Sequence, residues 1–188
     1  MQPTSRNIAG PIASMVRRRQ SVTIKHVAAD AGVSLRSFYR HFSGRDDLLL
    51  ALFEEEARLG ATMLDEEVRD VTDPGERARR SVEALCELVV TGSVYADVLV
   101  REHLRLGAER PDEMRAALAP MLDRFEAVLG AAAEAGDLRP VDRFDAATVL
   151  SLVLTHVQAA RLLAPEEPAP AERIWRFCRA ALAPEETS

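Results

Sequence analysis

The feature that most constrains the fold is an unbroken amphipathic run at residues 46–67, DDLLLALFEEEARLGATMLDEE. Its apolar side chains recur three and four positions apart, which is the spacing of one face of an α-helix. Two acidic residues, Asp46 and Asp47, open the run, where the positive end of a helix dipole favours negative charge. The run therefore predicts one long helix that must bury its apolar face against other elements.

The rest of the chain repeats this helical spacing, and no segment alternates apolar and polar residues as a half-buried strand does. Leu and Ala are abundant while aromatic residues make up 5%, which favours helix over strand. We therefore predict an all-α fold of about nine helices, the others covering residues 12–19, 23–30, 35–41, 76–91, 97–106, 114–135, 144–163 and 171–182. Loops are expected at 72–76, 107–113, 136–142 and 165–170, with a kink at Pro120.

Charge is distributed unevenly along the chain. The 188 residues carry a net charge of −6, which alone argues against a polyanionic partner. Residues 1–50, however, hold eight basic and three acidic side chains, a balance of +5, whereas the remaining 138 residues hold 16 and 27, a balance of −11. A basic head on an acidic body suggests that only the head meets nucleic acid, although charge blocks also arise on ordinary solvated surfaces.

Several classes of function lack their usual sequence signals. The four histidines, at positions 26, 41, 103 and 156, have no metal-ligand spacing, and the chain contains no GxSxG, P-loop or GxGxxG motif. We therefore expect no enzyme activity, no catalytic residue, no metal and no cofactor. The chain also has no signal-peptide pattern, no apolar run long enough to span a membrane, and only two cysteines, which together predict a cytoplasmic protein.

A helix–turn–helix pattern lies in the basic head, at residues 31–42, AGVSLRSFYRHF. Gly32 suits the end of one short helix and Ser34 the N-cap of the next, and Phe38 and Phe42 can pack beneath the second helix. The opposite face is polar, and its Arg36 can pair with a guanine edge through two hydrogen bonds. The outer residues are Leu35, Arg36, Ser37, Tyr39, Arg40 and His41, and the expected phosphate donors are Ser34, Ser37, Tyr39 and His41.

A plain helical hairpin with a solvated polar face would show the same helix–glycine–helix pattern. The charge asymmetry and the pair of phenylalanines in an otherwise polar run favour the other interpretation, in which the second helix enters a DNA major groove.

Residues 23–53 closely resemble the N-terminal DNA-binding domain of TetR-type transcriptional regulators. The resemblance implies a helix-turn-helix domain at residues 1–45 and a helical domain for effector binding and dimerisation at 46–188. It also implies that Thr23, Lys25 and Arg45 contact phosphates or a groove edge, and that residues 35–37 read bases. The matching positions are Thr23, Val27, Ala28, Ala31, Gly32, Val33, Ser34, Tyr39, Phe42, Arg45, Asp47 and Leu48.

The segment before Thr23 departs from the family's pattern. It is short, contains Gly10 and Pro11, and ends in three arginines and a glutamine at residues 17–20. The first helix is therefore expected to be truncated or irregular. The arginines could add phosphate contacts or simply form a solvated basic patch.

In this family the larger domain pairs two subunits, so that two heads about 34–36 Å apart read a palindrome. Residues 144–163 are apolar all round, which fits burial on more than one side, either against a second subunit or within one chain. The resemblance therefore favours a homodimer through the last two helices. The candidate interface residues are Leu150, Leu154, Val157, Arg161, Trp175 and Arg179.

The family's larger domain also binds a small effector. The clues to its site are polar, aromatic and sulfur-containing residues within apolar helices, each of which could equally be an ordinary core residue. An apolar or amphipathic ligand fits such a lining. The candidates are Met63, Cys86, Tyr95, His103, Met121, Phe125, Thr155 and His156.

The leading hypothesis is a dimeric repressor that leaves its palindromic, double-stranded operator when a small molecule binds the body. Effector binding would tilt the helix that starts at Asp46 and change the spacing of the two heads. The alternative is a helical interaction protein that keeps the fold without specific DNA binding.

Overall fold

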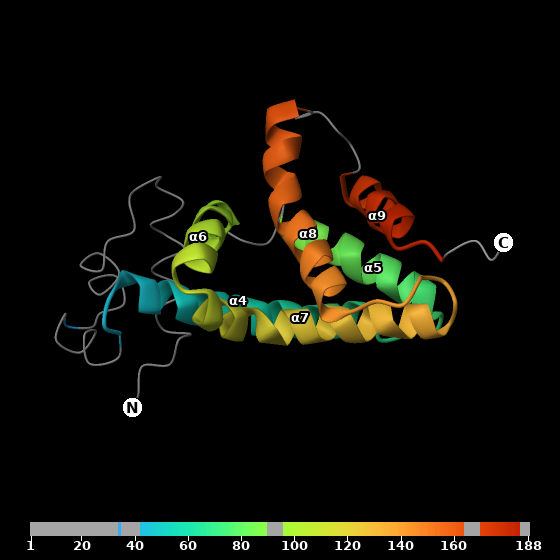
Figure 1. Cartoon of the computed structure of the whole chain (residues 1–188), viewed down its shortest axis with the longest axis horizontal. Coiled ribbons are helices and arrows are strands. Elements are labelled where there is room, and N and C mark those ends of the chain that lie inside the picture. The colour runs from blue at the N-terminus through green and yellow to red at the C-terminus, as the bar shows by residue number, and fades with distance from the viewer. Residues whose placement is uncertain (1–33, 35–41, 90–95, 164–169, 185–188) are drawn as a thin grey trace. The chain divides into compact units, whose positions relative to one another are not determined.

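The computed structural model describes residue 34 and residues 42–89, 96–163 and 170–184. This part of the chain contains six helices and no strand, which confirms the predicted all-α class. The helices expected at 12–19, 23–30 and 35–41 lie outside the described residues. The six are α4 (Arg45–Glu67), α5 (Pro74–Glu87), α6 (Ala96–Glu109), α7 (Pro111–Glu134), α8 (Arg143–Leu163) and α9 (Pro170–Ala181), shown in Figure 1.

The chain divides into two compact units. Unit 1 comprises Met1–Ala57 and Val94–Leu118, and unit 2 comprises Arg58–Ser93 and Ala119–Ser188. Helices α4 and α7 each contribute residues to both units. A domain boundary after Arg45, expected from the family resemblance, stays a prediction.

Unit 1 is built from the first part of α4, from α6 and from the start of α7. Leu48, Leu49 and Phe53 of α4 are buried, and so are Leu106 of α6 and Met114 of α7. Leu48, Leu49 and Phe53 are among the apolar residues whose spacing within 46–67 predicted a buried face, and their burial confirms that prediction. The helix starts at Arg45, one residue before its predicted start.

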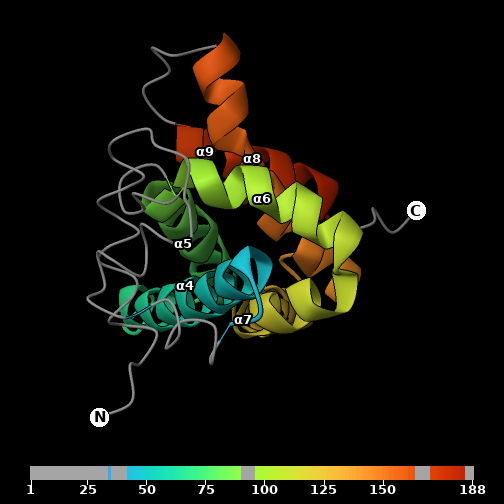
Figure 2. The same cartoon turned by 90° about the vertical axis from the view of Figure 1, so that its left-hand side faces the viewer.

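The predicted loop at 107–113 is wrong. Helix α6 continues to Glu109 and α7 begins at Pro111, which leaves only Arg110 between the two helices (Figure 2). Proline fits the first turn of a helix because its missing N–H would have no partner there. The corner is closed by hydrogen bonds from the N–H of Arg110 to Leu106 O, at 2.7 Å, and from the N–H of Met114 to Arg110 O, at 3.0 Å.

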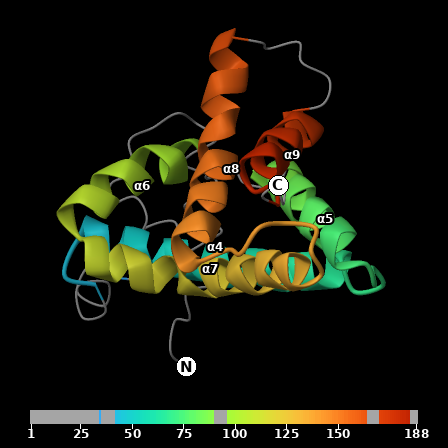
Figure 3. The ribbon, with the colours of Figure 1, turned by 45° about the vertical axis from the view of Figure 1, so that its right-hand side comes forward.

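Unit 2 contains α5, α8 and α9 together with the later parts of α4 and α7. Helix α9 packs on α5, and α8 contacts both of them (Figure 3). The buried side chains include Val82 of α5, Phe125 and Leu129 of α7, and Val153 of α8. Helix α4 approaches α7 closely at Gly60, because a Cβ atom there would collide with the end of the Met121 side chain.

The C-terminal end of α7 is set by Gly136, whose φ is 86°. The N–H of Gly136 donates to Ala133 O at 3.0 Å, and the N–H of Asp137 donates to Ala132 O at 2.9 Å. This pair of bonds is the Schellman arrangement, and it requires the left-handed conformation that glycine adopts without strain. The loop predicted at 136–142 follows and is confirmed.

The N-terminus of α5 lies earlier than predicted, because Asp73 caps the helix. Its Oδ1 accepts a hydrogen bond from the N–H of Glu76 at 2.7 Å, and Pro74 occupies the first helical position. The turn expected at 72–76 is therefore mostly the first turn of the helix.

Replacing Asp73 with alanine is expected to lower the free energy of unfolding by about 0.5–2 kcal/mol, because the N–H of Glu76 loses its acceptor. Urea denaturation followed by circular dichroism measures this loss. Asp70→Ala removes the same charge from an exposed residue just before the helix and serves as the control. Equal losses in the two variants would mean that the cap does not stabilise α5.

Candidate nucleic-acid interface and its contacts

The described part of the predicted DNA-binding surface is its C-terminal edge. Ser34 is exposed, Phe42 is half-buried, and Arg45 opens α4. These placements agree with the predicted exposure of Ser34 and with partial burial of Phe42. The other predicted DNA-binding residues lie outside the described residues and stay predictions: Thr23, Lys25, Leu35, Arg36, Ser37, Tyr39 and His41.

The turn into α4 is fixed by Asp47. Its Oδ2 accepts a hydrogen bond from the backbone N–H of Ser43 at 3.0 Å. The Asp47 side chain also receives a hydrogen bond from Arg110, and this bond, followed by the one from Ser43, lowers the pKa of Asp47. A charged cap of this kind holds the entry of the chain into the helix.

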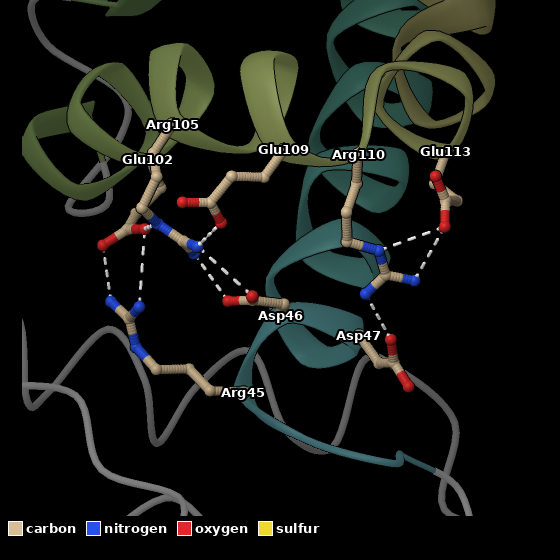
Figure 4. A network of polar contacts seen from close by, with 8 residues as sticks. All are labelled: Arg45, Asp46, Asp47, Glu102, Arg105, Glu109, Arg110 and Glu113. Carbon is tan, nitrogen blue, oxygen red and sulfur yellow. Dashed lines mark hydrogen bonds and ion pairs between the residues drawn. The ribbon is translucent and has the colours of Figure 1, made fainter.

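Arg45 is the predicted phosphate contact that the structure describes in full. Its Nη2 donates to Glu102 Oε1 at 2.5 Å and its Nη1 donates to Glu102 Oε2 at 3.4 Å (Figure 4). The Arg45 side chain is 39% exposed and that of Glu102 is 13% exposed. In this structure the predicted phosphate ligand is therefore paired with a carboxylate of α6.

Arg105 binds three carboxylates around this pair. It donates from Nε to Glu102 at 2.8 Å, from Nη2 to Asp46 at 2.5 Å, and from Nη1 to Glu109 at 2.5 Å (Figure 4). Its bond with Asp46, and then that with Glu102, raises the pKa of the Arg105 guanidinium, so the charge is permanent. Arg105 therefore joins α6 to the first turn of α4.

A third arginine extends the network to the start of α7. Arg110 donates to Asp47 at 2.6 Å and to Glu113 at 3.1 Å. We call the eight residues in Figure 4 the α4–α6 ion-pair cluster: Arg45, Asp46, Asp47, Glu102, Arg105, Glu109, Arg110 and Glu113. With three arginines and five carboxylates, the cluster has a net charge of −2.

His103 is the predicted effector-binding residue in unit 1. Its ring lies tilted against Phe53, with centroids 6.2 Å apart. Its Nδ1 is buried without a hydrogen-bond partner among the described residues, and burial lowers the pKa of the imidazole. A buried polar atom without a partner is energetically unfavourable, and a polar group placed beside it would satisfy it.

Glu56, a carboxylate of unit 1 whose pKa is raised and not lowered, was not among the residues selected from the sequence. Burial, and then the charge of Glu55, raises the pKa of Glu56 above its ordinary value. The three glutamates at 54–56 point in different directions around the helix, so one of them must turn toward the apolar face. That geometry is the signal in the sequence that could have identified Glu56.

The other predicted effector residues that the structure describes belong to unit 2, whereas His103 belongs to unit 1. Phe125 is 1% exposed, and Met121 is buried against Gly60 of α4. Cys86 is buried near Cys178, and burial raises its pKa to about 12. The full set stays a prediction: Cys86, Met121, Phe125 and His156 are buried, Thr155 is half-buried, Met63 is exposed, and Tyr95 lies outside the described residues.

His156 combines burial with an unused ring nitrogen. Its Nδ1 contacts Val153 O one turn earlier in α8, whereas its Nε2 is buried without a partner among the described residues. Because a carbonyl oxygen only accepts, Nδ1 is the donor in this contact. Thr155 by contrast is satisfied, since its hydroxyl donates to Ser151 O at 2.7 Å.

The predicted dimer residues divide by their exposure. Leu150 and Trp175 are already buried within this chain, Leu154 is half-buried and Arg179 is exposed. The side chains of Val157 and Arg161 lie outside the described part. Phe177 is an apolar residue of the same helix that is not among these six candidates, and it is 63% exposed on α9. Its position two residues after Trp175 places it on the other side of the helix.

None of the described helices is long and apolar enough to cross a membrane. Within the same residues, no group of three or more His, Cys, Asp or Glu side chains has the arrangement of a metal site.

Comparisons with known proteins agree with the resemblance seen in the sequence. Residues 20–52 match the family described as bacterial regulatory proteins, tetR family. FadR from Bacillus subtilis, solved in complex with stearoyl-CoA, is 14% identical with a TM-score of 0.76, over 95% of this chain and 100% of FadR. AibR, solved with isovaleryl coenzyme A and operator DNA, is 23% identical with a TM-score of 0.58, over 96% and 98%. The superantigen PfiT is 20% identical with a TM-score of 0.70, over 99% and 100%.

Proposed function

We propose that the chain, whose residues 20–52 match the tetR family of bacterial regulatory proteins, is a dimeric, ligand-responsive regulator of transcription in the cytoplasm. The observation that carries the proposal is the coincidence of this match with the basic segment at 31–42. In the sequence of that segment, Arg36 and its polar neighbours occupy the positions at which a recognition helix would read base edges. Its C-terminal side is joined through the Ser43–Asp47 cap to the 23 residues of α4.

The proposed effector is amphipathic. Two of the similar structures, FadR and AibR, hold coenzyme A thioesters, which combine an apolar acyl chain with a polar, negatively charged carrier. In this chain His103 and His156 each offer a buried, unused ring nitrogen beside apolar side chains, and such nitrogens gain a partner when a polar ligand group arrives. Ligand binding then favours the state with repositioned heads, and the repressor leaves its operator.

A second candidate function is that of a helical interaction protein without specific DNA binding. The similarity to PfiT, described as a superantigen, favours it, because the same fold serves proteins with different functions. The two candidates differ in what they predict for DNA, so one binding experiment separates them.

The experiment measures equilibrium binding of the full chain to a duplex from upstream of its own coding sequence, beside a shuffled duplex of equal length. For the regulator, we expect the upstream duplex to bind at least about 10³-fold more tightly. We also expect log K to fall linearly with log salt concentration, because bound arginines displace counterions from phosphates. Stearoyl-CoA added to the complex is expected to weaken it. Equal binding of both duplexes would favour the interaction protein.

Phe177 is expected to contribute to the dimer interface, since an aromatic side chain 63% exposed on α9 leaves apolar surface for a partner. Phe177→Glu is expected to raise the dimer dissociation constant by at least about 30-fold, because a buried aromatic anchor is typically worth about 2 kcal/mol or more. Sedimentation equilibrium measures the change.

Leu104→Glu is the matched control for Phe177→Glu. Leu104 is also 63% exposed but lies on α6, in unit 1. The Leu104→Glu substitution should leave the dimer dissociation constant near that of the parent. A Phe177→Glu variant that dimerises as well as the Leu104→Glu variant would place the interface elsewhere.

A further inference from the structure

We propose that Glu102 is an intramolecular competitor of DNA for Arg45. This inference rests on the proposed DNA-binding function and adds to it a contact that limits affinity from within the chain. The pair is bidentate, with Arg45 Nη2 at 2.5 Å and Nη1 at 3.4 Å from the two carboxylate oxygens of Glu102. A guanidinium held in this way presents its best donor edge to Glu102 and not to a phosphate.

The exchange of Arg45 from Glu102 to a phosphate leaves neither side unsatisfied. Glu102 keeps its hydrogen bond from Arg105 Nε, at 2.8 Å. Arg105 also remains bound to Asp46 and Glu109. A partly buried carboxylate that retained no cation would oppose the release of Arg45, and here a second arginine removes that penalty.

The exposures of the two side chains fit this exchange. Glu102 is the more buried partner at 13% exposed, and it is anchored on α6, whereas Arg45 is 39% exposed and reaches solvent. Arg45 is therefore the group that can move. Burial opposes ionisation of Glu102, but the bonds from Arg45 and Arg105 outweigh it and lower its pKa, so the carboxylate stays charged at neutral pH.

The charges around the Arg45–Glu102 pair also oppose binding of DNA to Arg45. The α4–α6 ion-pair cluster has a net charge of −2, and its ion pairs join Glu102, which binds Arg45, to Asp46 and Glu109 through Arg105. A phosphate that approaches Arg45 therefore meets a region of excess negative charge. The cluster therefore weakens the attraction between DNA phosphates and Arg45, which is the one predicted phosphate contact in the cluster.

The experiment compares Glu102→Gln with Glu109→Gln in the full chain. Both changes remove one negative charge from the cluster, but Glu102 binds Arg45 and Glu109 binds only Arg105 among the cluster's arginines. We expect Glu102→Gln to tighten binding to the upstream duplex by about three- to tenfold at about 0.1 M salt. Glu109→Gln is expected to give a smaller gain, which measures the effect of charge alone.

A second pair of variants tests whether the gain acts through Arg45. In an Arg45→Ala background, adding Glu102→Gln should increase the affinity for the upstream duplex by no more than Glu109→Gln does in the parent. Circular dichroism and thermal unfolding of each variant verify that the fold is kept.

Three results would overturn the inference. The first is weaker DNA binding by Glu102→Gln, which would mean that Glu102 positions Arg45 for DNA. The second is an equal gain in affinity from Glu109→Gln. The third is a full gain from Glu102→Gln that persists in the Arg45→Ala background. Failure of the parent and of every variant to prefer the upstream duplex would instead overturn the proposed function itself.

Discussion

Replacing Phe125 with alanine is expected to lower the free energy of unfolding by about 3–5 kcal/mol. Phe125 is 1% exposed in the middle of α7, among the buried side chains of unit 2. Truncation removes the ring's burial and leaves a cavity that helices on either side cannot fully close. Urea denaturation of the parent and the variant measures the loss, and an unchanged dependence on urea indicates that both unfold in the same way.

Phe144→Ala provides the control, because Phe144 is 78% exposed on α8. The same truncation there should change the free energy of unfolding by no more than about 0.5 kcal/mol. A Phe125→Ala variant as stable as Phe144→Ala would show that Phe125 borders open space. That result would agree with the prediction that Phe125 contacts an effector.

Replacing Arg36 with alanine is expected to cost about 1–3 kcal/mol of binding free energy at one base pair of the operator. A bidentate arginine distinguishes guanine from the other bases, so its loss relaxes the preference at that position and leaves the rest of the site unchanged. Binding to a set of duplexes, each with one substituted base pair, measures the preference position by position.

Arg69→Ala is the matched control for Arg36→Ala. It removes the same charge from an exposed residue of the body, after α4. It should keep the parent's preference at every base pair. If Arg36→Ala also keeps the preference of the parent at every position, the outer face assigned to residues 35–41 is wrong.

The local elements of this protein follow from its sequence. The apolar spacing and the acidic pair at Asp46 and Asp47 predict α4 to within one residue of its observed start. Helix termini were harder to predict, because Gly and Pro occur both in loops and within helices. Pro74 and Pro111 were assigned to loops, whereas each occupies the first turn of a helix. Gly107 was assigned to a loop as well, but it lies on the exposed side of α6, where it is tolerated.

The contacts between helices could not be predicted in the same way. Arg45 and Glu102 are separated by 57 positions in the sequence, and Arg110 and Asp47 by 63. Any of the chain's many exposed charges could form such pairs until the fold brings two of them together. The ion-pair cluster that surrounds the predicted phosphate contact is therefore a result of the structure.

The effector residues illustrate a second limit. An aromatic or sulfur-containing side chain on an apolar helix face is the same signal whether it packs in a core or lines a binding site. The structure buries Phe125 and Met121 within the chain, while Met63 is exposed. What distinguishes His103 and His156 is an unused buried nitrogen, which depends on the neighbours that the fold provides.

The most direct test of the account is a hydroxyl-radical footprint of the full chain on the DNA upstream of its coding sequence. A dimeric helix-turn-helix regulator predicts two protected patches related by dyad symmetry, with centres about 10–10.5 base pairs apart or a multiple of that spacing. The patches should fade when stoichiometric stearoyl-CoA is added. Uniform protection of every duplex, or none at concentrations where the chain is fully dimeric, would contradict a palindrome-reading regulator.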